Sequence, residues 1–544
     1  MTLPGEISRA PRSFGSRRGT KDKTTMAREK SDDRVVPNDG RKPIRIAEAR
    51  RGGKAVTHYE QADQLGLRFG TADSSKENVA GTEAGEPASV PRAVPKPKRT
   101  KNTRLRPMTM EEVAEEGNLR DAFEHVASND GAAGPDGEDI DEVRSHLDEV
   151  ISTLRHKLLE GTYRTGDVRR VWIPKANGER RGLGIPNVID RIVQQATHQV
   201  LSPFYERTFH DSSHGFRPNR SCHSAVAEAK RHLEDGYEWV VDIDLSRFFD
   251  TVHHQRLLER LARDVHDARV IALIRQMLRA KVILPDGVVV ATEMGTPQGG
   301  PLSPLLSNIV LDELDRELSA RGHRFVRYAD DCNIYVRSER AGHRVMASIS
   351  RFIERRLRLS VNAEKSAVAR PEERHFVGFS LRSNVEVDSI EVLVSKRTRD
   401  RLERTIRKLT RRNWGQSIDA CIERLNSYLR GWIAFFGICT KAEVTLLHNT
   451  DGHVRRRLRA LQLKQWKRKR TIAKQLAARG MKSAWRVVYR DRRSWWSLSG
   501  SPLMLKAMSV ASFKKRGLVS LEDEWAIIHP KLVIGPTQLT LQLG

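Results

Sequence analysis

Two acidic segments of the sequence have the residue types and the setting of a metal site. Tyr328-Ala329-Asp330-Asp331 has an apolar run on each side, which predicts a β-hairpin with two carboxylates at its turn. Adjacent carboxylates repel each other unless a cation neutralises them, and oxygen ligands of this kind suit Mg²⁺ bound jointly with substrate phosphates. The run from Trp239 predicts a buried strand that ends in carboxylates, so Asp244 is placed to bring a third carboxylate beside the hairpin. Three such carboxylates can hold two Mg²⁺ ions.

Two further segments suit phosphate chemistry. Gly299 and Gly300 lie between two prolines, which predicts a tight turn where a ligand can approach the backbone, and Ser307 or Asn308 would then cap a helix over 309–318. Lys175 and Arg181 flank a predicted hairpin turn and could grip a triphosphate. Taken singly, each acidic or basic segment is also typical of an ordinary surface turn, and the glycine turn of a structural loop.

The elements that must position these residues follow from periodicity. Apolar spacing predicts helices over 110–126 and 140–160, a strand over 168–174 that turns at 175–178, and a helix over 251–263. Helices and short strands then alternate to about residue 395. Beyond that point, Arg-rich stretches with interleaved Leu, Ile and Trp predict helices with a basic outer face.

The charge of the 544-residue chain is unevenly distributed. The net charge is +27, with +11 over 1–106, −7 over 107–395 and +21 over 396–493. Two basic arms around a mildly acidic middle predict a polyanionic partner, because each neutralised phosphate releases counterions. A merely solubilising basic surface is the alternative. Four cysteines without a Cys-x-x-Cys pair, and no run of 18 apolar residues, argue against a disulfide scaffold, a zinc finger or a membrane protein, and favour the cytoplasm.

Together these segments resemble, in order and spacing, the polymerase blocks of reverse transcriptases, most closely the group II intron-encoded reverse transcriptase–maturases of bacterial type. The resemblance spans roughly 107–520. Its blocks are Ile173-Pro174-Lys175 with Gly184-Ile185-Pro186, His214-Gly215-Phe216-Arg217-Pro218, the Asp244 segment, Pro297 to Leu305, Tyr328 to Asp331, Leu359 to Ser366 and Phe376 to Phe379.

The resemblance implies a role for each matching residue. Asp244, Asp330 and Asp331 are the expected catalytic metal ligands, for two Mg²⁺ ions that Mn²⁺ could replace. The expected nucleotide-binding residues are Lys175, Arg181, Phe249 (which would exclude a ribose 2′-OH), Gln298 and Lys365. Those expected to contact nucleic acid are Arg217, Phe376, Gly378, Arg404, Arg411, Lys467, Arg468, Lys469 and Arg470.

The fold class that the resemblance implies is α+β. It is a right-hand polymerase with fingers, a palm built on a small antiparallel sheet and a helical thumb, followed by a helical basic maturase region. The expected divisions are a disordered basic extension (1–100), a helical N-terminal extension of the reverse transcriptase (101–165), fingers and palm (166–392), thumb and maturase helices (393–480) and a C-terminal maturase-associated region (481–544). The lone Cys421 and Cys439 lack metal-ligand spacing, so no endonuclease domain is expected.

The implied function is RNA-dependent DNA synthesis by two-metal nucleotidyl transfer, with maturase activity that assists folding, splicing and mobility of the group II intron RNA. The expected partners are intron RNA, an RNA template with a DNA primer, dNTPs and a DNA target, with no membrane. The main alternative is a domesticated reverse transcriptase that acts in DNA repair or phage defence without an intron. A splicing factor with an inactive polymerase is disfavoured by the intact aspartates, and an RNA-dependent RNA polymerase by the bulky Phe249.

Overall fold

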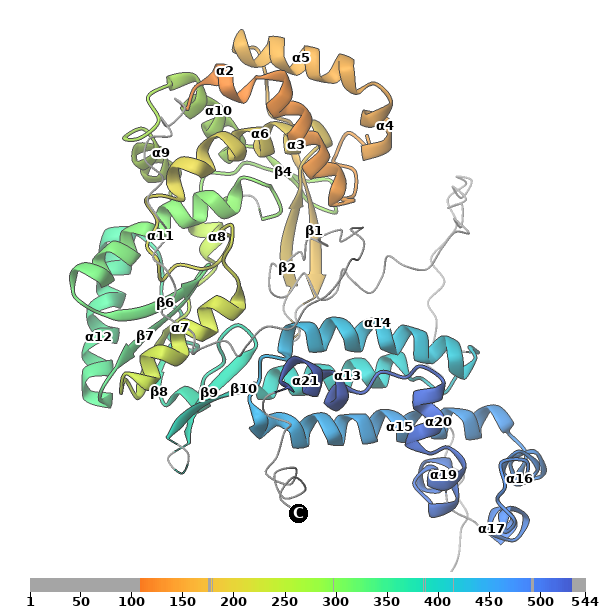
Figure 1. The fold of residues 1–544 in the computed structure, drawn as a ribbon. Helices are drawn as coiled ribbons and strands as arrows, with labels where there is room; N and C mark the ends of the chain where they lie inside the picture. The colour runs from red at the N-terminus through yellow and green to blue at the C-terminus, as the bar shows by residue number, and fades with distance from the viewer. Residues whose placement is uncertain are drawn as a thin grey trace, which may run out of the picture. The chain divides into compact units, whose positions relative to one another are not determined.

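A computed structural model describes residues 108–174, 178, 180–296, 298–384, 386, 388–413, 415–490 and 494–530. The expected disordered extension over 1–100, and Lys175, lie outside these described residues. The described chain begins with short helices and two sheets and continues as a series of helices (Figure 1).

Four helices precede the first strand and pack around helix α6. The two helices predicted over 110–126 and 140–160 are each divided in two. Thr109 caps the first, which stops at Ala114, while Asp139 forms a capping box and His146 leaves helical geometry (φ −131°, ψ 33°). The helices are α2 (Met110–Val113), α3 (Glu116–Ser128), α4 (Ile140–Ser145), α5 (Leu147–Leu159) and α6 (Val188–Tyr205).

The first sheet carries the hairpin predicted around 175–178. Strand β1 has the predicted bounds, Val168–Pro174, and pairs antiparallel with β2 (Arg180–Ile185). On its other side β1 pairs parallel with β4 (Val282–Ile283), which pairs with β5 (Val289–Val290), so the strand order is β2-β1-β4-β5.

The second sheet is fully antiparallel, as expected for a palm. Its order is β6-β7-β3-β8, with β6 and β7 forming the predicted hairpin and β3 in the centre. The strands are β3 (Trp239–Ile243), β6 (Arg324–Tyr328), β7 (Asp331–Val336) and β8 (Ala367–Ala369).

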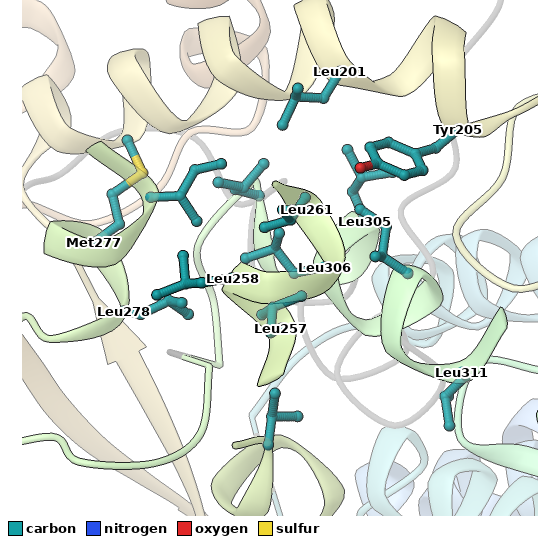
Figure 2. Close-up of a cluster of buried hydrophobic side chains, with 14 of the residues drawn as sticks. Leu201, Tyr205, Leu257, Leu258, Leu261, Met277, Leu278, Leu305, Leu306 and Leu311 are labelled. Carbon is teal, nitrogen blue, oxygen red and sulfur yellow. The ribbon is translucent and has the colours of Figure 1, made fainter. Parts of the chain in front are cut away.

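Helices that pack on these strands share one hydrophobic core. Leu201 and Tyr205 of α6 face Leu258 and Leu261 of α9, and Met277 of α10 lies nearby (Figure 2). The helix predicted over 251–263 is present as α9, and Thr251 instead ends the separate short helix α8. The elements are α7 (Cys222–Glu234), α8 (Phe248–Thr251), α9 (His254–Leu261), α10 (Ala268–Leu278), α11 (Ser303–Ala320), α12 (Glu339–Phe352) and the π-helical turn η1 (Ile353–Leu357).

A β-hairpin joins the palm to the C-terminal helices. Phe376 and Phe379 exchange two backbone hydrogen bonds of 2.9 Å across a turn in which Val377 (φ 43°) and Gly378 (φ 99°) are both left-handed. The carbonyl of Gly378 accepts from Thr398 Oγ1 at 2.9 Å. The short 3-10 turn η2 (Pro371–Glu373) precedes this turn, and β9 (Phe379–Asn384) and β10 (Ser389–Val394) follow it.

The rest of the described chain is helical, as predicted. Within it, no helix is long and apolar enough to cross a membrane. The elements are α13 (Lys396–Leu409), α14 (Ile418–Phe436), η3 (Lys441–Glu443), α15 (Val444–Trp466), α16 (Lys469–Ala477), α17 (Ala484–Arg490), α18 (Trp495–Ser499), α19 (Pro502–Ala507), α20 (Val510–Lys515) and α21 (Leu521–Ile528).

Gly378→Ala should destabilise the protein more than Gly480→Ala. Both glycines have positive φ, so each alanine costs roughly 1–2 kcal/mol of backbone strain. A Cβ at Gly378 would also lie 2.9 Å from the Phe436 ring of α14, whereas nothing lies within 4 Å at Gly480. Overpacking should add about 1–3 kcal/mol at Gly378. Urea unfolding of both variants measures the difference, and equal losses would contradict the packing argument.

Candidate active site

The palm sheet brings the three aspartates to one end of two adjacent strands. Strand β3 pairs with β7 so that Ile243 lies opposite Cys332. One step further along the same register, Asp244 follows β3 where Asp331 begins β7, and Asp330 occupies the β6–β7 turn. The predicted juxtaposition of the three residues is therefore present in the fold.

The loop after β3 is fixed by a segment distant in sequence. The backbone N–H of Asp244 donates to Ser366 Oγ at 3.0 Å, and its carbonyl accepts from the Asn362 N–H at 2.8 Å. These bonds bring Lys365 to the site, with its Nζ 3.7 Å from Asp244 Oδ2. Both side chains are about half exposed, so the pair is accessible to a ligand.

The carboxylates lie in a field that disfavours their charge. Burial raises the pKa of Asp331 well above the usual range, and the charges of Asp242, Asp330 and Asp244 raise it further. Burial also raises the pKa of Asp330, while the nearby Arg181 guanidinium partly offsets that effect. Burial and neighbouring carboxylates therefore both disfavour the ionised forms at this site.

Asp242 is a fourth carboxylate of this cluster and already has a partner. Its Oδ2 accepts from Arg374 Nε at 2.8 Å and from a terminal nitrogen of the same guanidinium at 2.5 Å. Asp242 was not among the ligands predicted from the sequence. This close pairing with Arg374 distinguishes Asp242 from Asp244, which lies 3.7 Å from Lys365 Nζ.

The donor set fits a divalent cation chemically, although it is not a ready-made metal cage. In the described part of the chain, no three carboxylate, imidazole or thiol groups converge as a metal-binding group. The raised pKa values nevertheless show that Asp330 and Asp331 share one negative field with Asp244. Hard carboxylate oxygens that repel each other are the ligands that Mg²⁺ accepts, usually together with substrate phosphates. The residues present therefore fit the ion.

The glycine turn packs against the β1–β2 hairpin. The Gly184 N–H donates to the Gln298 carbonyl at 2.6 Å, and Arg181 Nε donates to Gln298 Oε1 at 3.1 Å. A Cβ on Gly299 (φ 117°) would collide with the Gly184 carbonyl, so packing against β2 accounts for this glycine. Arg181 and Gln298 thus lie together near Asp330, while Lys175 is outside the described residues.

Phe249 lies in the short helix α8, which follows Asp244. Its carbonyl accepts from the Thr296 N–H at 2.7 Å, and its ring packs edge-on to the buried Phe248 at a centroid distance of 5.3 Å. Gly295 (φ 91°) packs so tightly on this carbonyl that a Cβ would lie 2.7 Å from it. The half-buried ring thus packs on Phe248, while the backbone of Phe249 is fixed against Gly295 and Thr296.

Arg327 is a residue of this site that the sequence indicated only as part of a strand. Its side chain is fully buried, and all five N–H donors are used. Nε and one terminal nitrogen bind the two oxygens of Asp315, at 2.7 and 2.6 Å. The others bind Ser213 Oγ, Asn308 Oδ1 and the carbonyl of Ala329, at 2.7, 3.0 and 2.8 Å.

This buried guanidinium fixes the aspartate turn. Ala329 has φ 57°, a left-handed conformation that costs energy for a residue with a Cβ, and the Arg327 bond holds its carbonyl. The segment from Ser212 runs beside β6, and a Cβ on Gly215 would collide with the Ala329 backbone nitrogen. The only sequence signal was an arginine inside an otherwise apolar strand.

Three residues expected to contact nucleic acid are buried, and one predicted helix begins earlier than expected. Arg217 is buried and donates four hydrogen bonds, to Glu206, His210 and Ser213, so its side chain braces a loop and is not free to contact nucleic acid. Phe376 is 4% exposed, so its ring supports the β9 turn, and Gly378 packs against α14. The helix predicted over 309–318 begins at Ser303, because Pro304 suits its first turn.

Ser307 and Asn308, expected as caps, are buried inside that helix. The Ser307 hydroxyl donates to the Ser303 carbonyl, and Asn308 donates to the Gly215 carbonyl. The remaining predicted nucleic-acid contacts are exposed, on or beside α13 and at the junction of α15 and α16. They are Arg404, Arg411, Lys467, Arg468, Lys469 and Arg470. Cys421 and Cys439 are buried thiols that form no disulfide.

Comparison with known families identifies the two parts of the chain. Residues 173–381 match the family described as reverse transcriptase (RNA-dependent DNA polymerase), and residues 399–480 match the group II intron, maturase-specific domain. The chain is therefore similar to reverse transcriptases over 173–381 and to group II intron maturase-specific domains over 399–480.

Individual relatives agree with this assignment. Protein YkfC of Escherichia coli (strain K12) is 43% identical over 37% of this chain and 55% of its own length. Group II intron-encoded protein LtrA of Lactococcus lactis subsp. cremoris is 39% identical over 36% of this chain and 32% of its own length. The chain thus spans about half of the first relative and a third of the second. A solved structure titled "Partial Cas6-RT-Cas1--Cas2 complex" aligns with 45% of this chain and 42% of its own at 25% identity, with a TM-score of 0.30.

Arg327→Met should destabilise the protein by about 3–5 kcal/mol, because it leaves the Asp315 carboxylate buried without its partner. Adding Asp315→Leu should recover part of the loss, since both buried charges are then removed. Arg120→Met, which breaks an exposed pair with Glu116, is the matched control and should cost no more than about 1 kcal/mol. Urea unfolding compares the variants, and similar losses at the two arginines would refute the buried clamp.

Asp331→Asn should raise stability at neutral pH. The folded state raises the pKa of Asp331 above its ordinary 3.8, so the free energy of unfolding falls as pH rises from 3.8 through the folded value. Asparagine has no charge to bury. The variant should therefore have a higher free energy of unfolding than the wild type above about pH 4, and an equal one below it. Asp121→Asn, at an exposed position of α3, is the control. Unfolding midpoints between pH 3 and 8 test this, and a pH-independent difference would contradict it.

Proposed function

We propose that the protein is an RNA-dependent DNA polymerase that extends the 3′ end of a primer on an RNA template by two-metal nucleotidyl transfer. The observation that carries the proposal is the meeting of Asp244, Asp330 and Asp331 at one end of a palm sheet, inside the region that matches reverse transcriptases. The proposed substrates are dNTPs, and the proposed duplex contains an RNA template and a DNA primer.

Asp244, Asp330 and Asp331 would hold Mg²⁺, or Mn²⁺ in its place. When bound, two such ions promote attack by the primer 3′-OH and stabilise the leaving pyrophosphate. The protein's own contribution is to fix the positions of the carboxylates. The pinned Asp244 loop and the Ala329 turn fix where the carboxylates lie before substrate arrives, which is the preorganisation that electrostatic catalysis needs.

The residues around the carboxylates would bind and select the nucleotide. Arg181, with Lys175, would bind the triphosphate, because guanidinium donors match phosphate oxygens. Gln298 is held beside Arg181 and would contact the incoming nucleotide. Lys365 would neutralise phosphate charge near Asp244. The held ring of Phe249 would exclude a ribose 2′-OH by contact.

We further propose that the C-terminal helices bind the parent intron RNA and assist its folding, splicing and mobility at a DNA target. The match to the maturase-specific domain over 399–480 and the charge of +21 over 396–493 support this role. The same match favours the intron partner over a repair or defence role without one. Exposed cations would supply salt-sensitive affinity for the RNA backbone.

Asp330→Ala or Asp331→Ala should abolish primer extension on RNA and leave RNA affinity nearly intact, because the carboxylates act on the reacting groups while the basic helices supply affinity. MgCl₂ should raise the thermal unfolding midpoint of the wild-type protein more than that of either variant. Extension at more than a few per cent of the wild-type rate would refute the assignment.

Phe249→Ala should increase incorporation of rNTPs relative to dNTPs by about tenfold or more, since the ring would no longer meet the 2′-OH. Phe249→Tyr retains the bulk and serves as the control, with discrimination close to wild type. Steady-state extension with each nucleotide class measures the ratio. An unchanged ratio in Phe249→Ala would remove the steric role.

A further inference from the structure

Helix α17 has an unusual outer face. Its buried side chains are Ala484 and Val488, which are one helical turn apart. Trp485 and Tyr489, each one position further along the chain, are also one turn apart and lie on an adjacent face, with 46% and 51% of their surfaces exposed. Their ring planes are nearly parallel, at 16°, with centroids 5.9 Å apart. The helix therefore packs through its small and aliphatic residues and presents its two large aromatic rings outward.

Cations surround this aromatic pair. Arg486 and Arg490 are exposed on the same helix. Helices α16 and α17 pack against each other (Figure 1), and Lys469 Nζ at the start of α16 donates to the Tyr489 carbonyl at 3.3 Å. That bond places Lys469, which is part of the exposed basic run of Lys467 to Arg470, beside the backbone of α17 at Tyr489.

We infer that Trp485 and Tyr489 form a stacking surface for unpaired bases of an RNA whose phosphates lie on the neighbouring cations. An exposed aromatic pair with acidic surroundings would suit a basic peptide, and one without charge would suit an apolar partner. Here the surrounding charge is positive, so the complementary occupant is an anion that also carries flat rings. A single-stranded nucleic acid has both properties, because every base has a π-face and every linkage a phosphate.

The inference rests on the proposed RNA-binding role of the C-terminal helices but concerns a different position. The maturase-specific match ends at residue 480, before α17 begins at Ala484. Exposed basic residues alone predict affinity for any RNA, paired or unpaired. The two rings distinguish unpaired from paired RNA, because bases stacked within a duplex offer no free face to an aromatic side chain. The site therefore selects loops, bulges and single strands over duplex.

The test compares full-length proteins for binding of two fluorescently labelled RNAs, a short strand without self-complementarity and a perfectly paired duplex of the same length. Trp485→Ala/Tyr489→Ala should weaken binding of the single strand by about tenfold or more, with duplex binding nearly unchanged. Trp485→Phe/Tyr489→Phe retains both rings and should restore most of the affinity. Ile527→Ala removes another exposed apolar side chain (72% exposed), outside the basic cluster, and should change neither.

Salt dependence separates stacking from charge. The alanine pair removes no charge, so the slope of affinity against salt should stay at the wild-type value. Neutralising Lys467, Arg468, Lys469 and Arg470 together should lower that slope by roughly 0.7 for each phosphate of the single strand that these cations had neutralised. Equal weakening on both RNAs, or no weakening on the single strand, would overturn the stacking site. A wild-type protein that binds neither RNA would instead refute the proposed RNA-binding role.

Discussion

The conformation of the Ala329–Asp330 turn depends on the buried ion pair between Arg327 and Asp315. Taking a guanidinium out of water costs several kcal/mol unless every donor finds a partner, and here all five do. Those partners come from α11, from the Ser213 segment and from the turn itself. One side chain thus ties α11 and the Ser213 segment to the turn that carries Asp330.

A second constraint comes from the aspartates themselves. Burial and mutual repulsion raise the pKa values of Asp330 and Asp331, so the fold holds these residues in an environment that their ionised forms disfavour. The Arg327 pair and the pinned Asp244 loop supply the rigidity that opposes this repulsion. The palm therefore keeps these carboxyl groups close together although their ionised forms repel each other.

Local patterns in the sequence were enough to predict strand β1 to the residue, the β6–β7 hairpin and the strand before Asp244. They failed where the burial and the partners of a residue depend on packing between segments that are distant in sequence. Arginine is usually a surface residue, yet Arg217 is buried, because the fold brings hydrogen-bond partners such as Glu206 to it. Ser307 and Asn308 have the side chains of helix caps, but Pro304 starts the helix earlier and Asn308 becomes an internal link to Gly215. The exposure of the aromatic face of α17 could not be predicted from the local sequence, because packing against other helices decides which face of an amphipathic helix is exposed.

The contact between β2 and the Gln298 turn has a thermodynamic consequence. Gly184 and Arg181 each donate a hydrogen bond to Gln298. Gly299 packs so closely on the Gly184 carbonyl that no side chain fits between the two segments. These contacts couple the position of the hairpin to the position of the turn. A ligand that favours one position of the hairpin favours the matching position of Gln298 by the same free energy, since such coupling is reciprocal. Closure of the β1–β2 hairpin over a nucleotide and alignment of the base by Gln298 would then be one equilibrium, described by one equilibrium constant.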